Sequence, residues 1–337
     1  MPSFPLLFDL GPRKPTTREV ADVVRRGGSG ALTEAERRAD EARYQEVTCR
    51  SALNHVKGMP FEWTLNPYRG CTHGCHYCYA RRYHVQFEMN ADDEFASVIL
   101  VKKNFVDVLT RELAKPSWTG AYVAVGTATD CYQPIEGHYK LTRGAIGALL
   151  GARNPMGLIT KGPMVVRDID LLTELSRVAR CTIYVSVPTV DEEAWARLEP
   201  GTAPPLQRLR AVRALVDAGI QAGVLMHPIV PGFSSSRAKI ERTVKAIADH
   251  GATFLSCAVM FLEDGTRTHF MHFLEREFPH WVPRYERLYT KKHAPDAYRK
   301  EIAGMVRALQ ARYGLQPRER DLHDEKDLAP VQVGFAW

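Results

Sequence analysis

A cluster of cysteines is the part of this sequence whose residue types and spacing most clearly indicate chemistry. Three of the seven cysteines lie within eight residues, at the spacing C-x3-C-x2-C, and they are Cys71, Cys75 and Cys78. Thiolates this close together can converge on one metal centre, and Gly70 and Gly74 let the backbone turn around it. Soft thiolate ligands select zinc or iron–sulfur clusters.

Three interpretations of this cluster compete. The spacing is too dense for three unrelated structural thiols in a chain with only seven cysteines. A structural zinc ion could take His73 or His76 as a fourth ligand, but such sites usually use two ligand pairs from separate segments, and the sequence has no second C-x2-C or H-x3-H pair. A [4Fe–4S] cluster held by three cysteines leaves one iron without a protein ligand. We favour the cluster, because an open coordination position is where a metal site performs chemistry.

The composition is that of an ordinary globular protein. The chain has 337 residues, of which 45% are hydrophobic and 25% charged, and a net charge of +6. These values exclude a mainly disordered chain and permit an anionic partner without requiring one. The richest apolar runs, 96–102 and 144–152, are too short to cross a bilayer, and residues 1–14 lack the basic start of a signal peptide. With an odd number of cysteines, these features predict a cytoplasmic protein without a disulfide framework.

Elements that could position the cysteines begin at about residue 61, where short apolar runs alternate with longer amphipathic ones. Strands are expected near 61–66, 121–126, 157–160, 181–187, 221–227 and 254–260. Helices are expected near 139–153, 168–179, 206–218, 237–250, 268–278 and 297–313. This alternation is typical of a parallel sheet, and about six units favour an α/β fold with a partial (β/α)6 TIM-like barrel over a doubly wound sheet.

The flanking segments complete the expected organisation. Residues 1–60 form an N-terminal extension that contains an exposed helix over 34–46, with Thr33 as its N-cap. Residues 61–265 form the core, and 266–337, where the strands stop, form a helical segment and a tail.

The cysteine spacing on the loop after the first strand, with Tyr77 directly before the third cysteine, resembles the signature of the radical S-adenosylmethionine (SAM) enzymes. The resemblance implies a [4Fe–4S] cluster on the three cysteines, SAM chelated at the open iron, and Tyr77 near the adenine. It also implies that a reductant such as flavodoxin or ferredoxin reduces the cluster. The reduced cluster then cleaves SAM to a 5′-deoxyadenosyl radical, which abstracts a hydrogen atom from the substrate.

A closer resemblance, over about 61–285, is to the branch that includes the spore photoproduct lyases, which repair a thymine lesion in DNA. It rests on the segments 66–71 (NPYRGC), 129–136 (TDCYQPIE), 160–161 (TK), 167–172 (RDIDLL), 186–189 (SVPT), 199–200 (EP) with Arg208, and 228–232 (PIVPG). Most of these segments follow predicted strands, at the barrel face where active sites form. The resemblance implies SAM contacts for Thr129, Lys161, Ser186 and Arg208. It makes DNA or RNA the leading substrate class, with a protein or small-molecule substrate open.

Two positions depart from these families. The glycine pair and glutamate that the wider family often carries after the second strand are absent from 125–130 (VGTATD). The lyases use a cysteine thiol to return hydrogen to the product radical, and Thr127, whose O–H bond is too strong for that role, occupies the position here. Cys131 is a candidate donor in the wrong register, and is otherwise expected to be a small buried core residue like Cys181 and Cys257. Photoproduct lyase activity proper is therefore an alternative, and a non-catalytic zinc or iron–sulfur module is another.

Some further polar residues have structural explanations that compete with functional ones. Asp130 and Glu136 could form an acid–base pair, but we favour a helix cap or an arginine partner for each. Asp168 is expected to be the N-cap of a helix. His269 and His272 lie one turn apart on a predicted helix, where two histidines can chelate a metal, but the sequence offers no clear third ligand.

Overall fold

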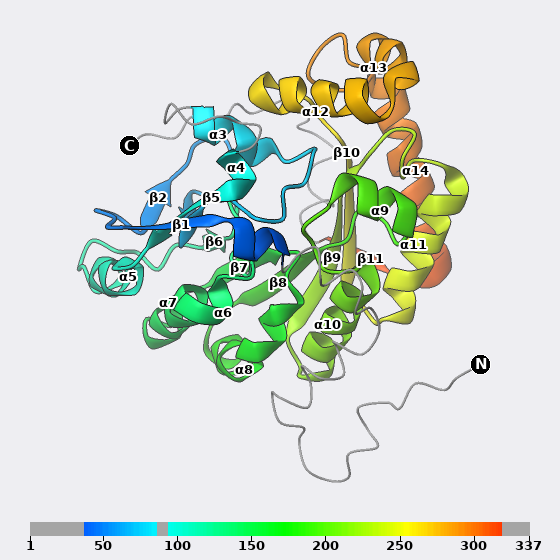
Figure 1. Cartoon of the computed structure of the whole chain (residues 1–337). Coiled ribbons are helices and arrows are strands. Elements are labelled where there is room, and N and C mark those ends of the chain that lie inside the picture. The colour runs from blue at the N-terminus through cyan, green and yellow to red at the C-terminus, as the bar shows by residue number, and fades with distance from the viewer. Residues whose placement is uncertain (1–36, 86–93, 319–337) are drawn as a thin grey trace.

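The molecule is built on an open, mostly parallel sheet (Figure 1). The computed structural model describes residues 37–85 and 94–318. Six strands run parallel in the order β10-β9-β8-β7-β6-β3. These strands are β3 (Trp63–Leu65), β6 (Val123–Val125), β7 (Met156–Thr160), β8 (Cys181–Ser186), β9 (Gln221–Ile229) and β10 (Phe254–Val259). The six strands expected from the sequence are confirmed, and so is the partial TIM-like barrel.

The sheet does not close, and each of its edges carries one further short strand. β2 (Leu53–His55) pairs antiparallel with β3, and β11 (Gln316–Pro317) pairs parallel with β10. The expectation that strands stop after 266 is therefore wrong. β11 is only two residues long and includes a proline, so it has no apolar run by which the sequence could reveal it.

Helices alternate with the strands and pack against the sheet (Figure 1). The longer ones are α5 (Phe105–Leu113), α7 (Leu141–Gly151), α8 (Ile169–Val178), α10 (Pro205–Asp217), α11 (Arg237–Asp249) and α14 (Asp296–Tyr313). Shorter segments are η2 (Tyr79–Arg81), α3 (Arg82–Val85), α4 (Glu94–Ser97), α6 (Glu136–Tyr139), η3 (Pro163–Asp168) and α9 (Glu192–Leu198). Apolar helix residues such as Leu109, Ile146 and Leu209 join the strands in one core. Every residue of β8 is buried, as expected for a central parallel strand covered on both faces.

A second, three-stranded sheet lies beside the barrel in the order β1-β5-β4. It contains β1 (Arg43–Val47), β5 (Val98–Lys102) and β4 (Tyr68–Arg69). The helix expected over 34–46 is therefore wrong in its second half, since helix covers only 37–41 of the described residues and Arg43–Val47 is a strand. β1 pairs in parallel with β5, which is about 55 residues away, and local propensity carries no trace of such a pairing. The expected cap, Thr33, lies outside the described residues.

The C-terminal segment is helical, as expected. It contains α12 (Asp264–Glu277), η4 (Pro279–Trp281), α13 (Val282–Leu288) and α14. Phe233, Phe270, Phe273 and Tyr285 pack these helices onto the barrel in a separate apolar cluster that also includes Cys75. The segment is thereby joined to the loop that carries the cysteines. Of the described helices, none combines the length and the apolar character that a membrane span requires.

Candidate active site

The three cysteines lie on a loop, residues 70–78, which we call the cysteine loop. Its backbone makes two turns, in which the amides of Gly74 and Cys78 each donate to the carbonyl three residues earlier, at 3.1 and 3.2 Å. Gly70, at the start of the loop, has a φ of +81°, and a Cβ there would lie 2.5 Å from the carbonyl oxygen of Val98. Glycine is therefore required at this position by both conformation and space.

Buried contacts hold the cysteine loop from two sides. The guanidinium of Arg81 donates from Nε to the carbonyl of Cys75 (3.2 Å) and from Nη2 to the carbonyl of Gly74 (2.9 Å). On the other side, the amide of His76 donates to the carbonyl of Leu198 at the end of α9 (3.0 Å). The path of the loop is thus fixed by segments distant in the sequence.

The thiols of the loop suit an iron–sulfur cluster in their chemistry. Cys71 and Cys75 are buried and Cys78 is half-buried. Burial raises the pKa of Cys71, and the neighbouring Asp130, Cys75 and Cys78 raise it further. Burial also raises the pKa of Cys75 to about 12, although Lys161 partly offsets this. Thiolates that lie close together in a buried place repel one another, so they need bound cations to stabilise them. The iron ions of a cluster supply that positive charge.

The same thiols are not arranged for a single ion. In the part of the chain that the structure describes, no three His, Cys, Asp or Glu side chains converge closely enough to hold one metal ion. The fit to a cluster therefore rests on the soft donor set and its burial.

A buried charge network lies beside the cysteine loop. Glu199 and Arg208 form an ion pair at 2.7 Å, and their side chains are 3% and 0% exposed. Tyr77 donates its hydroxyl hydrogen to the same carboxylate, and the Lys161 ammonium lies 3.9 Å from it. Burial disfavours the charge on Glu199, but Arg208 and Lys161 outweigh burial and lower its pKa. Two cations thus face one carboxylate.

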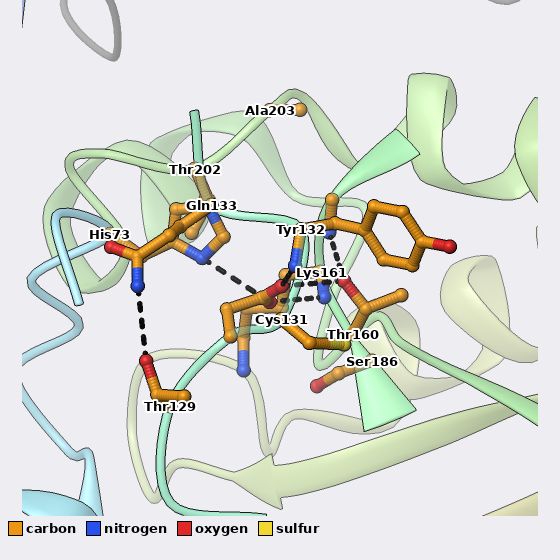
Figure 2. Close-up of polar contacts among 12 residues, drawn as sticks. His73, Thr129, Cys131, Tyr132, Gln133, Thr160, Lys161, Ser186, Thr202 and Ala203 are labelled. Atoms are coloured by element: carbon orange, nitrogen blue, oxygen red, sulfur yellow. Dashed lines mark hydrogen bonds and ion pairs between the residues drawn. The ribbon is translucent and has the colours of Figure 1, made fainter. Parts of the chain in front are cut away.

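Lys161 directly follows β7 and lies beside Thr160, the last residue of that strand (Figure 2). Its amide donates to a carboxylate oxygen of Asp130 at 2.6 Å, which fixes where the side chain leaves the backbone. Burial opposes the charge of Lys161, but Cys75 and Glu199 outweigh burial and raise its pKa. The 3.9 Å gap to Glu199 is longer than a hydrogen bond. The ammonium therefore keeps donors for an acceptor on a ligand.

Arg208 reaches the site from α10 and is fully buried. It donates to the carbonyls of Ala203 (2.8 Å) and Ser186 (3.1 Å) and to the hydroxyl of Thr202. Its donors thus bind the protein itself in this structure, and a SAM contact of Arg208 stays a prediction. Ser186 ends β8, and its hydroxyl lies 3.4 Å from the carbonyl of His227.

Thr129 lies against the cysteine loop. Its hydroxyl donates to the carbonyl of Gly70 (2.6 Å) and accepts from the amide of Gln133 (3.1 Å), as Figure 2 shows for the second contact. The Gln133 side chain also accepts from the amide of Thr72 (3.2 Å). Thr129 and Gln133 therefore brace the loop, and a SAM contact of Thr129 stays a prediction.

The two carboxylates of the 129–136 segment have structural partners. Glu136 has the arginine favoured from the sequence, whereas Asp130 binds a hydroxyl, backbone amides and a histidine instead of a helix cap or an arginine. Asp130 accepts from Thr160 (2.6 Å) and lies 3.4 Å from His73, which lowers its pKa against the effect of burial. Glu136 pairs with Arg167 at 2.7 Å. Asp168 occupies the expected N-cap position of α8, but its carboxylate binds arginines instead of the helix amides.

The two candidate positions for a hydrogen donor differ in their surroundings. Cys131 is fully buried in the main core, and its thiol lies 3.6 Å from the carbonyl of Ile159, as expected for a small core residue. Thr127 accepts from Asn66 (3.3 Å), and its carbonyl accepts from the hydroxyl of Tyr79. A donor role for Cys131 stays an untested prediction.

Sequence reasoning missed two side chains of the site. The sequence marks Glu199 only as part of an EP motif and assigns it no role. Its spacing of nine residues from Arg208, across a Pro- and Gly-rich loop, could have indicated that the two side chains pair. His269, expected as half of a helical pair, lies 3.0 Å from His76 of the cysteine loop. That contact could not be read from sequence, because α12 and the loop are about 190 residues apart.

Comparisons with known proteins agree with this geometry. The model of the radical SAM superfamily matches residues 65–257. An uncharacterized protein of Mycobacterium tuberculosis (strain H37Rv) is 37% identical over 298 residues, which cover 87% of this chain and 88% of that protein. One of Methanocaldococcus jannaschii is 24% identical over 234 residues, which cover 69% of this chain and 83% of that protein.

The fold is also similar to that of solved spore photoproduct lyase structures. One, complexed with dinucleoside spore photoproduct, has a TM-score of 0.62 at 17% identity and covers 86% of this chain and 84% of that one. A mutant with bound AdoMet and the dinucleoside has a TM-score of 0.59 at 14% identity, with coverages of 85% and 83%. The match to the radical SAM superfamily spans more than half of the chain, so the chain belongs to that superfamily and is a radical SAM enzyme.

Proposed function

We propose that Cys71, Cys75 and Cys78 bind a [4Fe–4S] cluster and that SAM binds between the cluster and the network around Lys161. The observation that carries the proposal is the placement of three cysteines on one largely buried loop beside a network in which Lys161 and Arg208 face the carboxylate of Glu199. When bound, the reduced cluster and SAM supply a 5′-deoxyadenosyl radical that abstracts a hydrogen atom from the substrate.

The network gives each side chain a distinct part in binding SAM. Arg208 neutralises Glu199 at 2.7 Å, so the charge of Lys161 is left to attract an anionic group. The methionyl carboxylate is such a group, and an ammonium can donate to it directly. Tyr77 is held by its hydrogen bond to Glu199, which fixes the ring next to the adenine that we assign to it. Ser186 and Thr129 carry hydroxyls near the ends of β8 and β6, on either side of β7.

For the substrate, we propose a nucleic acid. The support is the fold shared with spore photoproduct lyase structures that hold a dinucleoside, together with the mild net charge of +6. Thr127, where the lyases use a cysteine, argues for a reaction other than photoproduct reversal. Photoproduct lyase activity proper remains the alternative and predicts that dinucleoside spore photoproduct is consumed.

The first experiment is anaerobic reconstitution with iron and sulfide, reduction with dithionite, addition of SAM, and an assay for 5′-deoxyadenosine. Wild type should form it, and a Cys71→Ala, Cys75→Ala, Cys78→Ala variant should not. Single-stranded DNA, duplex DNA and RNA are then added separately, and a substrate should accelerate nucleoside formation. If wild type binds zinc alone, the cluster proposal fails. If it cleaves SAM but no nucleic acid changes the rate or is modified, the substrate proposal fails.

Lys161 has its own test, the substitution Lys161→Met. A hydrogen bond to a charged group contributes about 1.5–3 kcal/mol, so the variant should bind SAM at least tenfold more weakly while binding as much iron as wild type. SAM binding is measured through its effect on the cluster's EPR spectrum, and Lys161→Arg, which keeps the charge, is the matched control. An unchanged affinity in Lys161→Met would show that Lys161 does not contact the ligand.

A further inference from the structure

One polar group inside the cysteine loop lacks a partner. Among the described residues, the buried side-chain atoms without a hydrogen bond are the hydroxyl of Thr72 and Nε of Arg82. Thr72 directly follows Cys71 and is 1% exposed. A buried hydroxyl that has left water without gaining a new hydrogen bond is destabilising, and native structures seldom leave one in that state.

The backbone of Thr72 is held on both sides, and the residue is buried, so its hydroxyl does not reach solvent in this structure. Its amide donates to Gln133 at 3.2 Å, and Gln133 is itself held by the carbonyl of Gly70 at 3.1 Å. Its carbonyl lies against Gly201, where a Cβ would come within 2.3 Å of the Thr72 oxygen. A group that binds at the cysteine loop can supply the missing acceptor.

We propose that the hydroxyl of Thr72 donates a hydrogen bond to a sulfur of the cluster bound by Cys71, Cys75 and Cys78, and so raises the reduction potential of the cluster. This inference rests on the proposed cluster. Reduction by one electron makes the cluster more negative, and a hydrogen bond to sulfur stabilises the more negative state. Such hydrogen bonds are one of the means by which proteins set cluster potentials. Thr72 is then a positioning residue that tunes the cluster.

The test compares Thr72→Val, which has nearly the same shape without the hydroxyl, with Thr72→Ser, which keeps it. Both full-length variants and wild type are reconstituted anaerobically and titrated with dithionite without SAM, with EPR as the readout. Losing one hydrogen bond should change the reduced-to-oxidised ratio at a fixed potential about tenfold. For a one-electron couple this moves the midpoint of Thr72→Val about 59 mV more negative, and Thr72→Ser should stay near wild type.

A second measurement does not depend on the cluster. In the metal-free protein the hydroxyl has no partner, so Thr72→Val should leave the thermal midpoint unchanged or raise it. A lower midpoint for metal-free Thr72→Val would mean that the hydroxyl already has a partner within the protein, and would overturn the inference. This measurement also decides the matter if Thr72→Val takes up less iron than wild type.

The outcomes separate this inference from the proposed function. If wild type and both variants bind iron and sulfide equally but share one midpoint potential, the hydroxyl has another acceptor, such as a buried water, and the inference is wrong. If wild type forms no iron–sulfur cluster, the proposed function fails first. A negative shift confined to Thr72→Val supports both.

Discussion

The ion pair of Glu199 and Arg208 allows a quantitative prediction about the stability of the site. Arg208→Met keeps much of the side-chain volume but removes the guanidinium. Glu199, at 3% exposure, then stays buried with Tyr77 and a more distant Lys161 as partners. Removing one member of a buried ion pair typically costs about 3–5 kcal/mol, because the other charge is left uncompensated.

Two features of the structure place the expected loss within that range. The carbonyls of Ala203 and Ser186 lose their donor in Arg208→Met, which adds to the loss. Lys161 and Tyr77 still face Glu199, which limits it. We therefore expect the free energy of unfolding of the metal-free protein to fall by about 3–4 kcal/mol.

The assay is urea unfolding at neutral pH, followed by circular dichroism, for wild type, Arg208→Met, Glu199→Gln and the double variant. Glu199→Gln removes the charge that Arg208 compensates, so its cost should be at least about 1 kcal/mol smaller in the Arg208→Met background than in wild type. A loss below about 1 kcal/mol for Arg208→Met, or single costs that add within about 0.5 kcal/mol, would refute the ion-pair argument.

Two further predictions concern the cysteine loop and a helix cap. Gly70→Ala should lower iron uptake strongly, because its Cβ would lie 2.5 Å from a backbone oxygen. The control is Gly120→Ala, which has a similar positive φ but no atom within 4 Å of its Cβ, and it should bind iron like wild type. Equal iron contents of the two variants would contradict the steric argument. Asp191 caps α9 and pairs with Lys239 and Arg242, and although burial opposes its charge these contacts lower its pKa. Because the folded pKa is below the unfolded one, Asp191→Asn should cost up to about 1 kcal/mol at pH 7 through its lost ion pairs. The difference should shrink as the pH falls below about 4, the ordinary aspartate pKa, and disappear below the folded pKa. A cost independent of pH, measured by urea unfolding, would count against the charge.

The barrel could be predicted from the sequence because each of its strands is an apolar run that differs from its flanks. Val123–Val125 and Cys181–Ser186 are buried at every position, so the sequence pattern and the burial coincide. β1 was missed for the opposite reason. Its residues, RYQEV, are mostly exposed, and they form a strand only because β5 offers an edge. Pairing between distant segments is decided by tertiary contacts, which local patterns do not record.

The site was predictable in part for a related reason. Thr129, Lys161 and Ser186 lie at or just beyond the ends of parallel strands, and such ends meet at one edge of a sheet. The sequence could not show which atoms each of these side chains contacts. The structure shows Thr129 bound to the loop backbone and Arg208 bound to Glu199, roles that depend on which atoms face each other.

The arrangement of charges explains why a buried glutamate would be useful beside the site that we propose for the SAM carboxylate. A lone lysine in this position would be pushed toward its neutral form by burial. Glu199 counters that effect and helps to keep Lys161 charged, yet it does not saturate the ammonium, because its stronger contact is with Arg208, at 2.7 Å against 3.9 Å. Arg208 in turn is held by the carbonyls of Ala203 and Ser186, so it cannot follow the carboxylate, which would lose its contact with Arg208 if it shifted toward Lys161. The network thus holds Lys161 charged and with donors to spare, which is the state that binding a carboxylate requires.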